Sequence, residues 1–399
     1  MPGSFISHRP NTFSFGKRRS EACLSEFLSK RQSDHSFRTL PNKSHLIDFC
    51  SNDYLGFSRS ALLRDKIKKE LARIGNYPEG STGSRLITGN HPLFEELEDS
   101  IAKYHRAEAG LIFNSGYDAN LGFFSSVPQY NDLVLFDESV HASIRDGIKL
   151  TRGKAVEFRH NDLEDLKQKL EGDYENIYIA VESVYSMDGD FAPLTELTEI
   201  ARKRGINLVV DEAHATGLFG PKGEGRVAEL GLEKDVFARI HTFSKAVGCQ
   251  GAIVLGSQML KQFLINFARP FIFSTAPSFH AFIAVKCAYD ILSKQHRRIL
   301  KISMLVNLFK QTFNPSEGMT LIQSDSPIQS VIIPGNKQAL SVSQKLEEAG
   351  IYAKAILYPT VPRNTERIRL VIHSFNTEEE IRALCSVLCY RCQSVNHNH

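Results

Sequence analysis

The chain has 399 residues, of which 42% are hydrophobic and 23% charged, so it can bury a large core and is long enough for roughly two or three domains. The net charge is only +3, and no basic run exceeds the short Lys17-Arg18-Arg19, which argues against a dedicated nucleic-acid-binding protein. No stretch approaches the roughly 18 apolar residues that cross a bilayer, and the segment Met1-Pro-Gly-Ser-Phe5 lacks a secretion-signal pattern. We therefore expect a cytoplasmic protein without a membrane segment.

The first two-thirds of the chain predict an α/β domain. After a polar, irregular N-terminal arm over residues 1–44, a short strand is expected at 46–50, followed by helices at 61–74 and 93–104 with apolar residues three or four apart. Further strands are expected at 110–113, 132–136, 155–158, 177–181, 208–210 and 252–255, with helices at 162–170 and 193–204 between them. Because these strands are apolar throughout rather than alternating, they predict a mostly parallel sheet covered on both faces.

The pattern changes after the turn at Ser274-Thr-Ala-Pro277. One long helix is expected at 279–313, followed by strands at 328–333, 351–357 and 368–372 and helices at 337–349 and 377–390. We interpret this part as a smaller α+β domain. The predicted division is an arm at 1–44, a large domain at 45–280 and a C-terminal domain at 281–399.

The C-terminal helix contains three of the seven cysteines of the chain, Cys385, Cys389 and Cys392. Their spacing suits small apolar side chains on a helix, and a fourth ligand with zinc-like spacing is missing. The odd number of cysteines, without repeated spacing, is typical of reduced thiols. We therefore expect no metal site.

An acid and a lysine are the central candidates for chemistry. The apolar run at 208–210 ends in Asp211, so a buried strand would deliver a carboxylate to the C-terminal edge of the sheet, followed closely by His214. Lys245 follows in His241-Thr-Phe-Ser-Lys245, before Gly248. An acid that pairs a ring nitrogen and a lysine that forms an imine are the groups that hold pyridoxal phosphate. Taken alone, Asp211 fits a helix cap or a salt bridge equally well, and Lys245 a solvated charge.

Other polar residues follow the predicted strands. Gly116 and Tyr117 follow the strand at 110–113 and open a helix, which is a natural phosphate site, and Thr242 could reach the same phosphate. His141 could stack on a flat cofactor, although a lone histidine is more often a core residue. Ser186 adds a polar group after the strand at 177–181.

Two arginines, Arg367 and Arg369, lie two residues apart at the start of the strand expected at 368–372. Alternation puts Arg367 and Arg369 on one face, where a guanidinium can hold a carboxylate by two hydrogen bonds. The alternative is a solvated strand face. The sequence Asp211-Glu-Ala-His214 also occurs in helicase ATPases, but the required Gly-x4-Gly-Lys-[Ser/Thr] loop is missing.

Several motifs together resemble one enzyme family, the α-oxoamine synthases, which are fold-type I pyridoxal-phosphate enzymes. The resemblance covers roughly residues 45–390, in the order expected. The motifs are Ser51-Asn-Asp-Tyr-Leu-Gly56, Gly80-Ser-Thr-Gly-Ser-Arg-Leu86, Thr88-Gly-Asn-His91, Ser139-Val-His-Ala-Ser143, His160-Asn-Asp162, Ser183-Val-Tyr-Ser-Met-Asp-Gly-Asp190, Asp211-Glu-Ala-His-Ala-Thr-Gly217, Thr242-Phe-Ser-Lys245 and Pro359-Thr-Val-Pro362.

The resemblance implies specific roles around the cofactor. Lys245 would hold the cofactor covalently and later move protons, while Asp211 would pair the pyridine nitrogen. His214 would bond to the ring hydroxyl, His141 would stack on the ring and Ser186 would contact the cofactor. The phosphate ligands would be Gly116, Tyr117 and Thr242, together with Ser274 and Thr275 from the other subunit of a homodimer. The substrate ligands would be Arg369 for the amino-acid carboxylate and Asn52, Thr360 and Arg38 for the acyl donor.

The implied reaction is the decarboxylative condensation of an amino acid with an acyl thioester. The motif at 51–56, the segment Phe271-Ile-Phe-Ser-Thr275 and the motif at 359–362 favour the branch of biotin biosynthesis that joins L-alanine to a pimeloyl thioester, on coenzyme A or a carrier protein, to give 8-amino-7-oxononanoate. Thr82 and Ser244 replace glycines frequent in the family or in that branch, and a serine before the lysine also occurs in sphingolipid-type relatives.

Three alternatives stay open on the sequence. The first is the same chemistry with glycine or serine and another acyl-CoA, because one methyl group changes binding by only ~1–3 kcal/mol. The second is a non-catalytic subunit, which would be expected to lack the lysine at 245. The third is an aminotransferase on the same scaffold.

Overall fold

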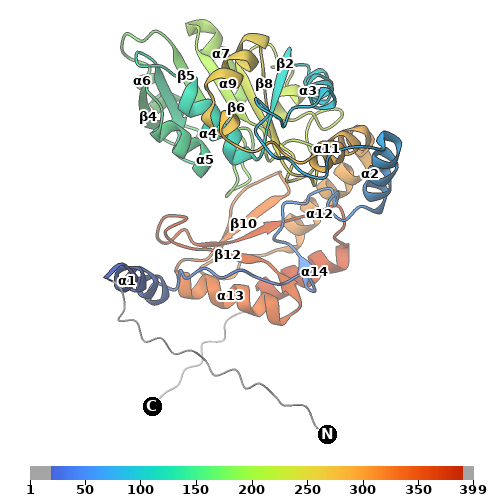
Figure 1. Cartoon of the computed structure of the whole chain (residues 1–399). Helices are drawn as coiled ribbons and strands as arrows, with labels where there is room; N and C mark the ends of the chain where they lie inside the picture. The colour runs from blue at the N-terminus through green and yellow to red at the C-terminus, as the bar shows by residue number, and fades with distance from the viewer. Residues whose placement is uncertain (1–18, 390–399) are drawn as a thin grey trace, which may run out of the picture.

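A computed structural model describes residues 19–389 of the chain. The segments considered above at Met1–Phe5 and Lys17–Arg18, and Cys392, lie outside the described residues. The fold has a large α/β part, drawn above in Figure 1, and a smaller part with its own sheet below. No helix within residues 19–389 has both the length and the hydrophobicity needed to span a bilayer.

The large part is built on a seven-stranded sheet with the order β2-β8-β7-β6-β5-β3-β4. Strand β8 runs opposite to the other six strands. The strands are β2 (Ala109–Phe113), β3 (Leu133–Asp137), β4 (Lys154–Phe158), β5 (Ile177–Glu182), β6 (Asn207–Asp211), β7 (Ala238–Thr242) and β8 (Ala252–Gly256). The prediction of a mostly parallel α/β sheet is therefore confirmed.

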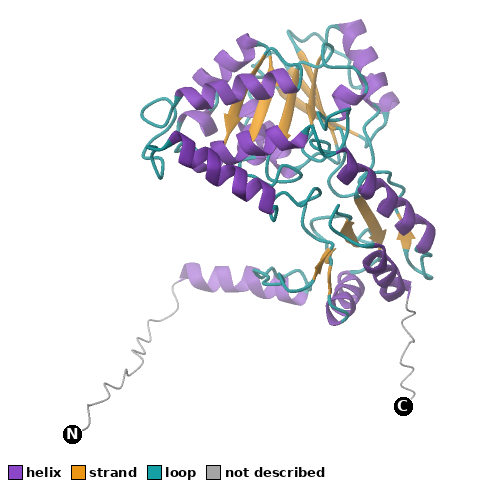
Figure 2. Cartoon of the chain, turned by 90° about the vertical axis from the view of Figure 1, so that its right-hand side faces the viewer, coloured by secondary structure: helices purple, strands orange, loops and turns teal. Residues whose placement is uncertain are grey.

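Helices cover both faces of this sheet, as Figure 2 shows with strands between helices. Strand β3 explains why: Val134 packs with one cluster, whereas its neighbours Leu133 and Leu135 pack with the other, and all three are buried. The first face is covered by α4 (Gly116–Ser126), α5 (Ala142–Lys149), α9 (Gln258–Phe267) and α10 (Arg269–Ile272). The second is covered by α6 (Leu163–Gln168), α7 (Leu194–Arg204) and α8 (Arg226–Glu229).

The smaller part is an antiparallel sheet with helices packed on it. Its strand order is β12-β13-β10-β9, from β9 (Thr320–Leu321), β10 (Ile328–Ile332), β12 (Lys354–Ile356) and β13 (Arg367–Val371). Helix α13 (Asn336–Glu348) packs against α14 (Glu378–Cys389). Strand β1 (Ile47–Asp48) pairs with β11 (Ile351–Tyr352), which ties the start of the predicted large domain to this part. The domain limits at 44 and 280 stay a prediction.

Three element predictions are wrong in detail. The single strand expected at 351–357 is two strands, β11 and β12, which belong to different sheets. Residues expected in an irregular arm form α1 (Arg19–Ser33), where strong helix formers and an acidic first turn at Glu21 outweigh the low hydrophobicity. The long helix expected at 279–313 is two helices, α11 (Phe279–Leu292) and α12 (His296–Thr312). The break at 293–295 contains no Gly or Pro, so the apolar pattern runs through it without a signal.

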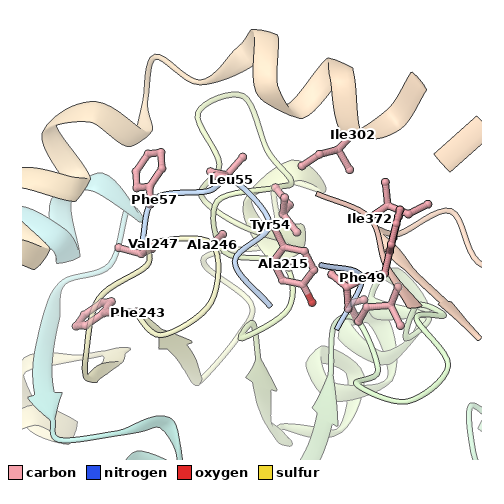
Figure 3. Close-up of a cluster of buried hydrophobic side chains, with 14 of the residues drawn as sticks. Phe49, Tyr54, Leu55, Phe57, Ala215, Phe243, Ala246, Val247, Ile302 and Ile372 are labelled. Carbon is pink, nitrogen blue, oxygen red and sulfur yellow. The ribbon is translucent and has the colours of Figure 1, made fainter. Parts of the chain in front are cut away.

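A buried cluster joins the helices to the loops that hold the site. Helices α2 (Ala61–Ile74) and α3 (Pro92–Tyr104) pack into it together with α11. Figure 3 shows its centre, where Phe243, Ala246 and Val247 flank position 245 and Ala215 follows position 214. Because these side chains are close to fully buried, the loops after β6 and β7 are fixed by core packing rather than left as free surface loops.

Candidate active site

The C-terminal edge of the large sheet collects most of the predicted site residues. Strands β5 and β6 end side by side, with Glu182 opposite Asp211 in parallel register, and β7 ends next to them at Thr242. The loop after Thr242 then turns back through Gly248, which has a φ of +65°. A Cβ at Gly248 would lie 2.5 Å from the backbone nitrogen of Ser58, so the close approach requires glycine.

Lys245 lies against His214 at this edge. Its Nζ is 2.9 Å from His214 Nε2, and the other ring nitrogen of His214 is 2.6 Å from the hydroxyl of Tyr54. Burial lowers the pKa of Lys245 to about 8, although the carboxylates of Asp211 and Glu182 oppose the shift. Burial also holds the pKa of His214 well below its ordinary value. A neutral imidazole therefore faces an amine that is far easier to deprotonate than a surface lysine.

Asp211 is 6% exposed and has only neutral partners. Its Oδ1 accepts from the backbone N–H of Ala213 at 2.8 Å, and its Oδ2 accepts from Asn120 Nδ2 at 2.7 Å. Within residues 19–389, no lysine, arginine or histidine forms an ion pair with it. A buried carboxylate needs a cationic partner, which a protonated ring nitrogen would supply. The residue therefore fits the pyridine nitrogen of pyridoxal phosphate.

The start of α4 has the features of a phosphate site. Ser115 caps the helix by accepting from the backbone N–H of Asp118, and Gly116 is the first helical residue. A Cβ at Gly116 would lie 3.4 Å from Thr242 Oγ1, so the hydroxyl of Thr242 stands directly beside the helix end. The N–H groups and dipole of a helix N-terminus attract an anion. Tyr117 is exposed, and its hydroxyl donates to Asp146 Oδ2 at 2.6 Å.

His141 is an exposed residue that caps α5 rather than a buried core histidine. Its Nδ1 accepts from the backbone N–H of Ser143 at 3.2 Å and lies 2.8 Å from Ser143 Oγ. Desolvation holds the pKa of His141 below its ordinary value although part of the residue is exposed, and the charges of Asp211 and Lys245 act on this pKa in opposite directions. The ring therefore lies close enough to Asp211 and Lys245 to interact with their charges.

Arg369 is brought together with two other predicted residues. Its side chain is largely buried, and Nε donates to the backbone carbonyl of Ser186 at 2.6 Å, while Nη2 donates to Asn52 Oδ1 at 3.1 Å. Arg367 pairs with Asp188 instead. The whole of β13 is buried, so the alternative of a solvated strand face does not hold.

A cavity of about 770 Å³ places Thr360, one of the acyl-side candidates, beside residues of the sheet edge, whereas Asn52 does not line it. It is lined by His141, Ser186 and Thr360, among others. Arg38 joins it indirectly, since its Nη2 donates to Thr360 Oγ1 at 3.2 Å. A second cavity of about 780 Å³ lies between α13 and α14 and shares no residue with this one.

Ser274 and Thr275 lie beside the loop that precedes α4. Asn114 Nδ2 donates to the carbonyl oxygen of Thr275 at 3.0 Å, two residues before Gly116. Their predicted contact with the phosphate of another subunit stays a prediction.

Three residues at the site were missed by the sequence analysis. Glu182 ends a buried strand, so the argument used for Asp211 could have found it. Tyr54 lies in the motif at 51–56, but only Asn52 of that motif was given a role. Asn120 gave no signal, because an asparagine within a helix is ordinary.

Glu182 predicts a pH-dependent stability. It is 2% exposed, and burial followed by the charge of Asp211 raises its pKa from 4.5 to about 8. Between these two values the folded state holds a proton that the unfolded state has lost, so stability falls as pH rises through this window. Glu182→Gln should remove this fall. Urea midpoints of the cofactor-free protein at about pH 5 and pH 8 measure it.

Glu196→Gln, on the exposed side of α7, is the matched control and should retain the fall. An equal loss of stability in wild type and Glu182→Gln would contradict the assignment.

The comparisons with known proteins agree with this geometry. The family model for aminotransferases of class I and II matches residues 44–388. The chain is 40% identical to 8-amino-7-oxononanoate synthase of Emericella nidulans, over 92% of this chain and 94% of that protein. It is 35% identical to the aminoacyl transferase sphA of Byssochlamys spectabilis, over 92% and 86%.

A solved structure shows the same fold with the cofactor. A variant of serine palmitoyltransferase from S. paucimobilis, with a bound PLP–myriocin aldimine, superimposes with a TM-score of 0.83 at 26% identity, over 93% of this chain and 98% of that chain. The predictions of a fold-type I architecture and of the family are confirmed. The chain belongs to the aminotransferase class I and II family and, within it, to the α-oxoamine synthases.

Proposed function

We propose that the protein condenses L-alanine with a pimeloyl thioester to give 8-amino-7-oxononanoate, carbon dioxide and the free thiol, with pyridoxal phosphate as cofactor. The main support is that Lys245, His214 and Asp211 lie at one sheet edge, where Asp211 has no cationic partner among residues 19–389. The chain is also 40% identical to an 8-amino-7-oxononanoate synthase. The cofactor, when bound, withdraws electrons from the α-carbon of the amino acid.

The roles of the chain's own residues follow from their contacts. Lys245 would hold the aldehyde carbon of the cofactor and then accept and return protons at Nζ, which suits an amine whose pKa is lowered to about 8. Neutral His214, held by Tyr54, would bond to the ring hydroxyl. Asp211 would hold the proton of the ring nitrogen. The start of α4 with Thr242 would bind the phosphate.

The substrates would meet between Arg369 and the cavity. The guanidinium of Arg369, oriented by Ser186 and Asn52, would take the carboxylate of the amino acid. The acyl chain would enter the cavity lined by Thr360 and His141, with Arg38 at its outer side.

We also propose a cytoplasmic homodimer with shared active sites. Leu86, Ile87 and Phe273 are exposed apolar side chains of the kind that a subunit interface covers. Ser274 and Thr275 follow Phe273 and would reach the phosphate of the other subunit. All cysteines within residues 19–389 are free thiols, as suits a reducing compartment. Sedimentation analysis and cell fractionation test these two points.

The product mass tests the reaction. Pimeloyl-CoA with L-alanine should yield 8-amino-7-oxononanoate and carbon dioxide, whereas glycine or serine should react poorly, and Lys245→Ala serves as the inactive control.

A larger turnover with serine and a long acyl-CoA would instead support the second candidate, a sphingoid-type synthase. That candidate is favoured by the likeness to an aminoacyl transferase and a serine palmitoyltransferase, and by Ser244 before the lysine. A keto acid formed without carbon dioxide would indicate an aminotransferase.

Arg369→Lys should raise the KM for the amino acid by about 10- to 100-fold, with a smaller change in kcat. Lysine keeps the charge but loses the two-pronged geometry, and one charge-assisted hydrogen bond is worth about 1.5–3 kcal/mol. Steady-state kinetics at saturating thioester measure the effect. Arg363→Lys, an exposed arginine stacked on Tyr358, is the control, and an unchanged KM in Arg369→Lys would refute the carboxylate assignment.

A further inference from the structure

A series of polar side chains links Asp211 to His141 through two residues that have no role in the scheme above. Asn120, in α4, is 2% exposed, and Ser143, in α5, is 0% exposed. Asn120 Nδ2 lies 2.7 Å from Asp211 Oδ2 and 3.0 Å from Ser143 Oγ. Ser143 Oγ lies 2.8 Å from His141 Nδ1.

Elementary chemistry fixes the direction of these hydrogen bonds. An ionised Asp211 only accepts, so the amide of Asn120 must turn its nitrogen toward it, and that nitrogen donates its second hydrogen to Ser143 Oγ. The hydroxyl of Ser143 has one proton, which is then free for His141 Nδ1. The backbone N–H of Ser143 donates to the same atom at 3.2 Å.

Two donors at Nδ1 leave that nitrogen without a proton. A neutral imidazole must then carry its proton at Nε2. Nδ1 is turned toward the first turn of α5, so Nε2, on the opposite side of the ring, faces away from that turn. His141 lines the cavity of about 770 Å³ together with Ser186 and Thr360. Burial lowers the pKa of His141, which favours the neutral ring.

We propose that Asn120 and Ser143 are positioning residues that hold His141 as the Nε2–H tautomer, so that a neutral ring offers a hydrogen-bond donor to a substrate oxygen, the carbonyl of the thioester. The identity of this oxygen rests on the proposed function, but the tautomer does not. The same amide bonds to Asp211, so one side chain orients both the acid at the ring nitrogen and the histidine. Asn120 thereby links α4 to the start of α5 and to the end of β6.

Nitrogen-15 NMR of the histidine-labelled, cofactor-free protein tests the tautomer directly. The His141 resonances, assigned by their loss in His141→Asn, should show an unprotonated Nδ1 and a protonated Nε2. Protonation at Nδ1 in the wild-type protein would overturn the proposal without any variant of Asn120 or Ser143.

Ser143→Ala removes the hydroxyl donor and Asn120→Ala removes the group that orients it. Both variants should therefore show a measurable share of the Nδ1–H tautomer, because the longer contact from the backbone N–H of residue 143 is then the only fixed donor to Nδ1. Ser143→Thr, which keeps a hydroxyl, should restore the Nε2–H form, and Ser139→Ala, at the same cavity, should leave the spectrum unchanged. Thermal unfolding of each variant identifies any that fail to fold. A pure Nε2–H form in a folded Ser143→Ala would refute the positioning role.

Kinetic measurements test the proposed hydrogen bond from His141 to the thioester, independently of the NMR test of the tautomer. Ser143→Ala should lower kcat/KM for the thioester by about 2- to 12-fold, the equivalent of one neutral hydrogen bond. A changed tautomer with unchanged kcat/KM would overturn the thioester contact. Absence of any product in the wild-type enzyme would count against the proposed function, whereas the NMR result would still stand.

Discussion

Lys245→Ala is expected to lower kcat by at least about 10²–10⁴-fold, which is the usual contribution of one positioned proton-transfer group. The loss should exceed this range, because the same amine would also hold the cofactor covalently. The structure gives the physical reason. Nζ lies 2.9 Å from His214 Nε2, and burial lowers its pKa to about 8, so no surface lysine can replace it.

The measurement combines kinetics with chemical trapping. Borohydride reduction of the wild-type enzyme, followed by peptide mapping, should place the cofactor on the peptide that contains Lys245. Lys234→Ala, at an exposed position in the loop before β7, is the control and should retain full activity and the same peptide. Attachment of the cofactor to any other side chain would contradict the proposed reaction.

The fold was predictable where hydrophobicity reported the environment directly. The continuous apolar runs at β3, β5 and β6 predicted strands covered on both faces, and Leu133, Val134 and Leu135 are all fully buried. The break between α11 and α12 was not predictable, because no residue at 293–295 disfavours a helix strongly. Helix α1 was missed because its side chains are mostly exposed, so no apolar face marks it.

The sequence predicted which residues belong to the candidate site better than it predicted which of them are in contact. Parallel strands end at one edge, so Asp211 and Thr242 had to lie near each other once the strands were recognised. The contact of Arg369 with Ser186 and Asn52 joins positions far apart in the chain, and it forms only because β13 lies against the loops that follow β5 and β1. The family motifs supplied those residues before any contact was known.

The contacts that orient the site had no sequence signal of their own. Tyr54 could have been a surface residue of a polar loop, but it is buried and holds His214. Asn120 lies within a helix whose pattern predicts only packing, yet its amide meets the carboxylate of Asp211. Such residues are set by three-dimensional distances, which hydrophobic periodicity does not encode.

Asp211→Asn is the second large effect that we expect. The substitution keeps the shape but removes the charge opposite the ring nitrogen, and a hydrogen bond to a charged group is worth about 1.5–3 kcal/mol. Cofactor affinity should therefore fall by about 10- to 100-fold, and kcat should fall further because an unprotonated ring withdraws electrons poorly. Titration of the cofactor-free protein with pyridoxal phosphate, followed by absorbance, measures the affinity.

The structure also predicts how the variant would respond locally. In the wild-type protein, the two carboxylate oxygens of Asp211 accept from the backbone N–H of Ala213 and from Asn120 Nδ2. An asparagine has an NH₂ group in place of one of these oxygens, so it can accept from only one of the two donors. The other donor would face an NH₂ group, so the loop to His214 should lose order, with weaker amide protection in hydrogen exchange. Asp235→Asn, an exposed acid before β7, should change neither affinity nor exchange. Unchanged affinity in Asp211→Asn would show that this carboxylate does not face the ring nitrogen, and the site would then need another acid for that role, for which Glu182 is the neighbouring candidate.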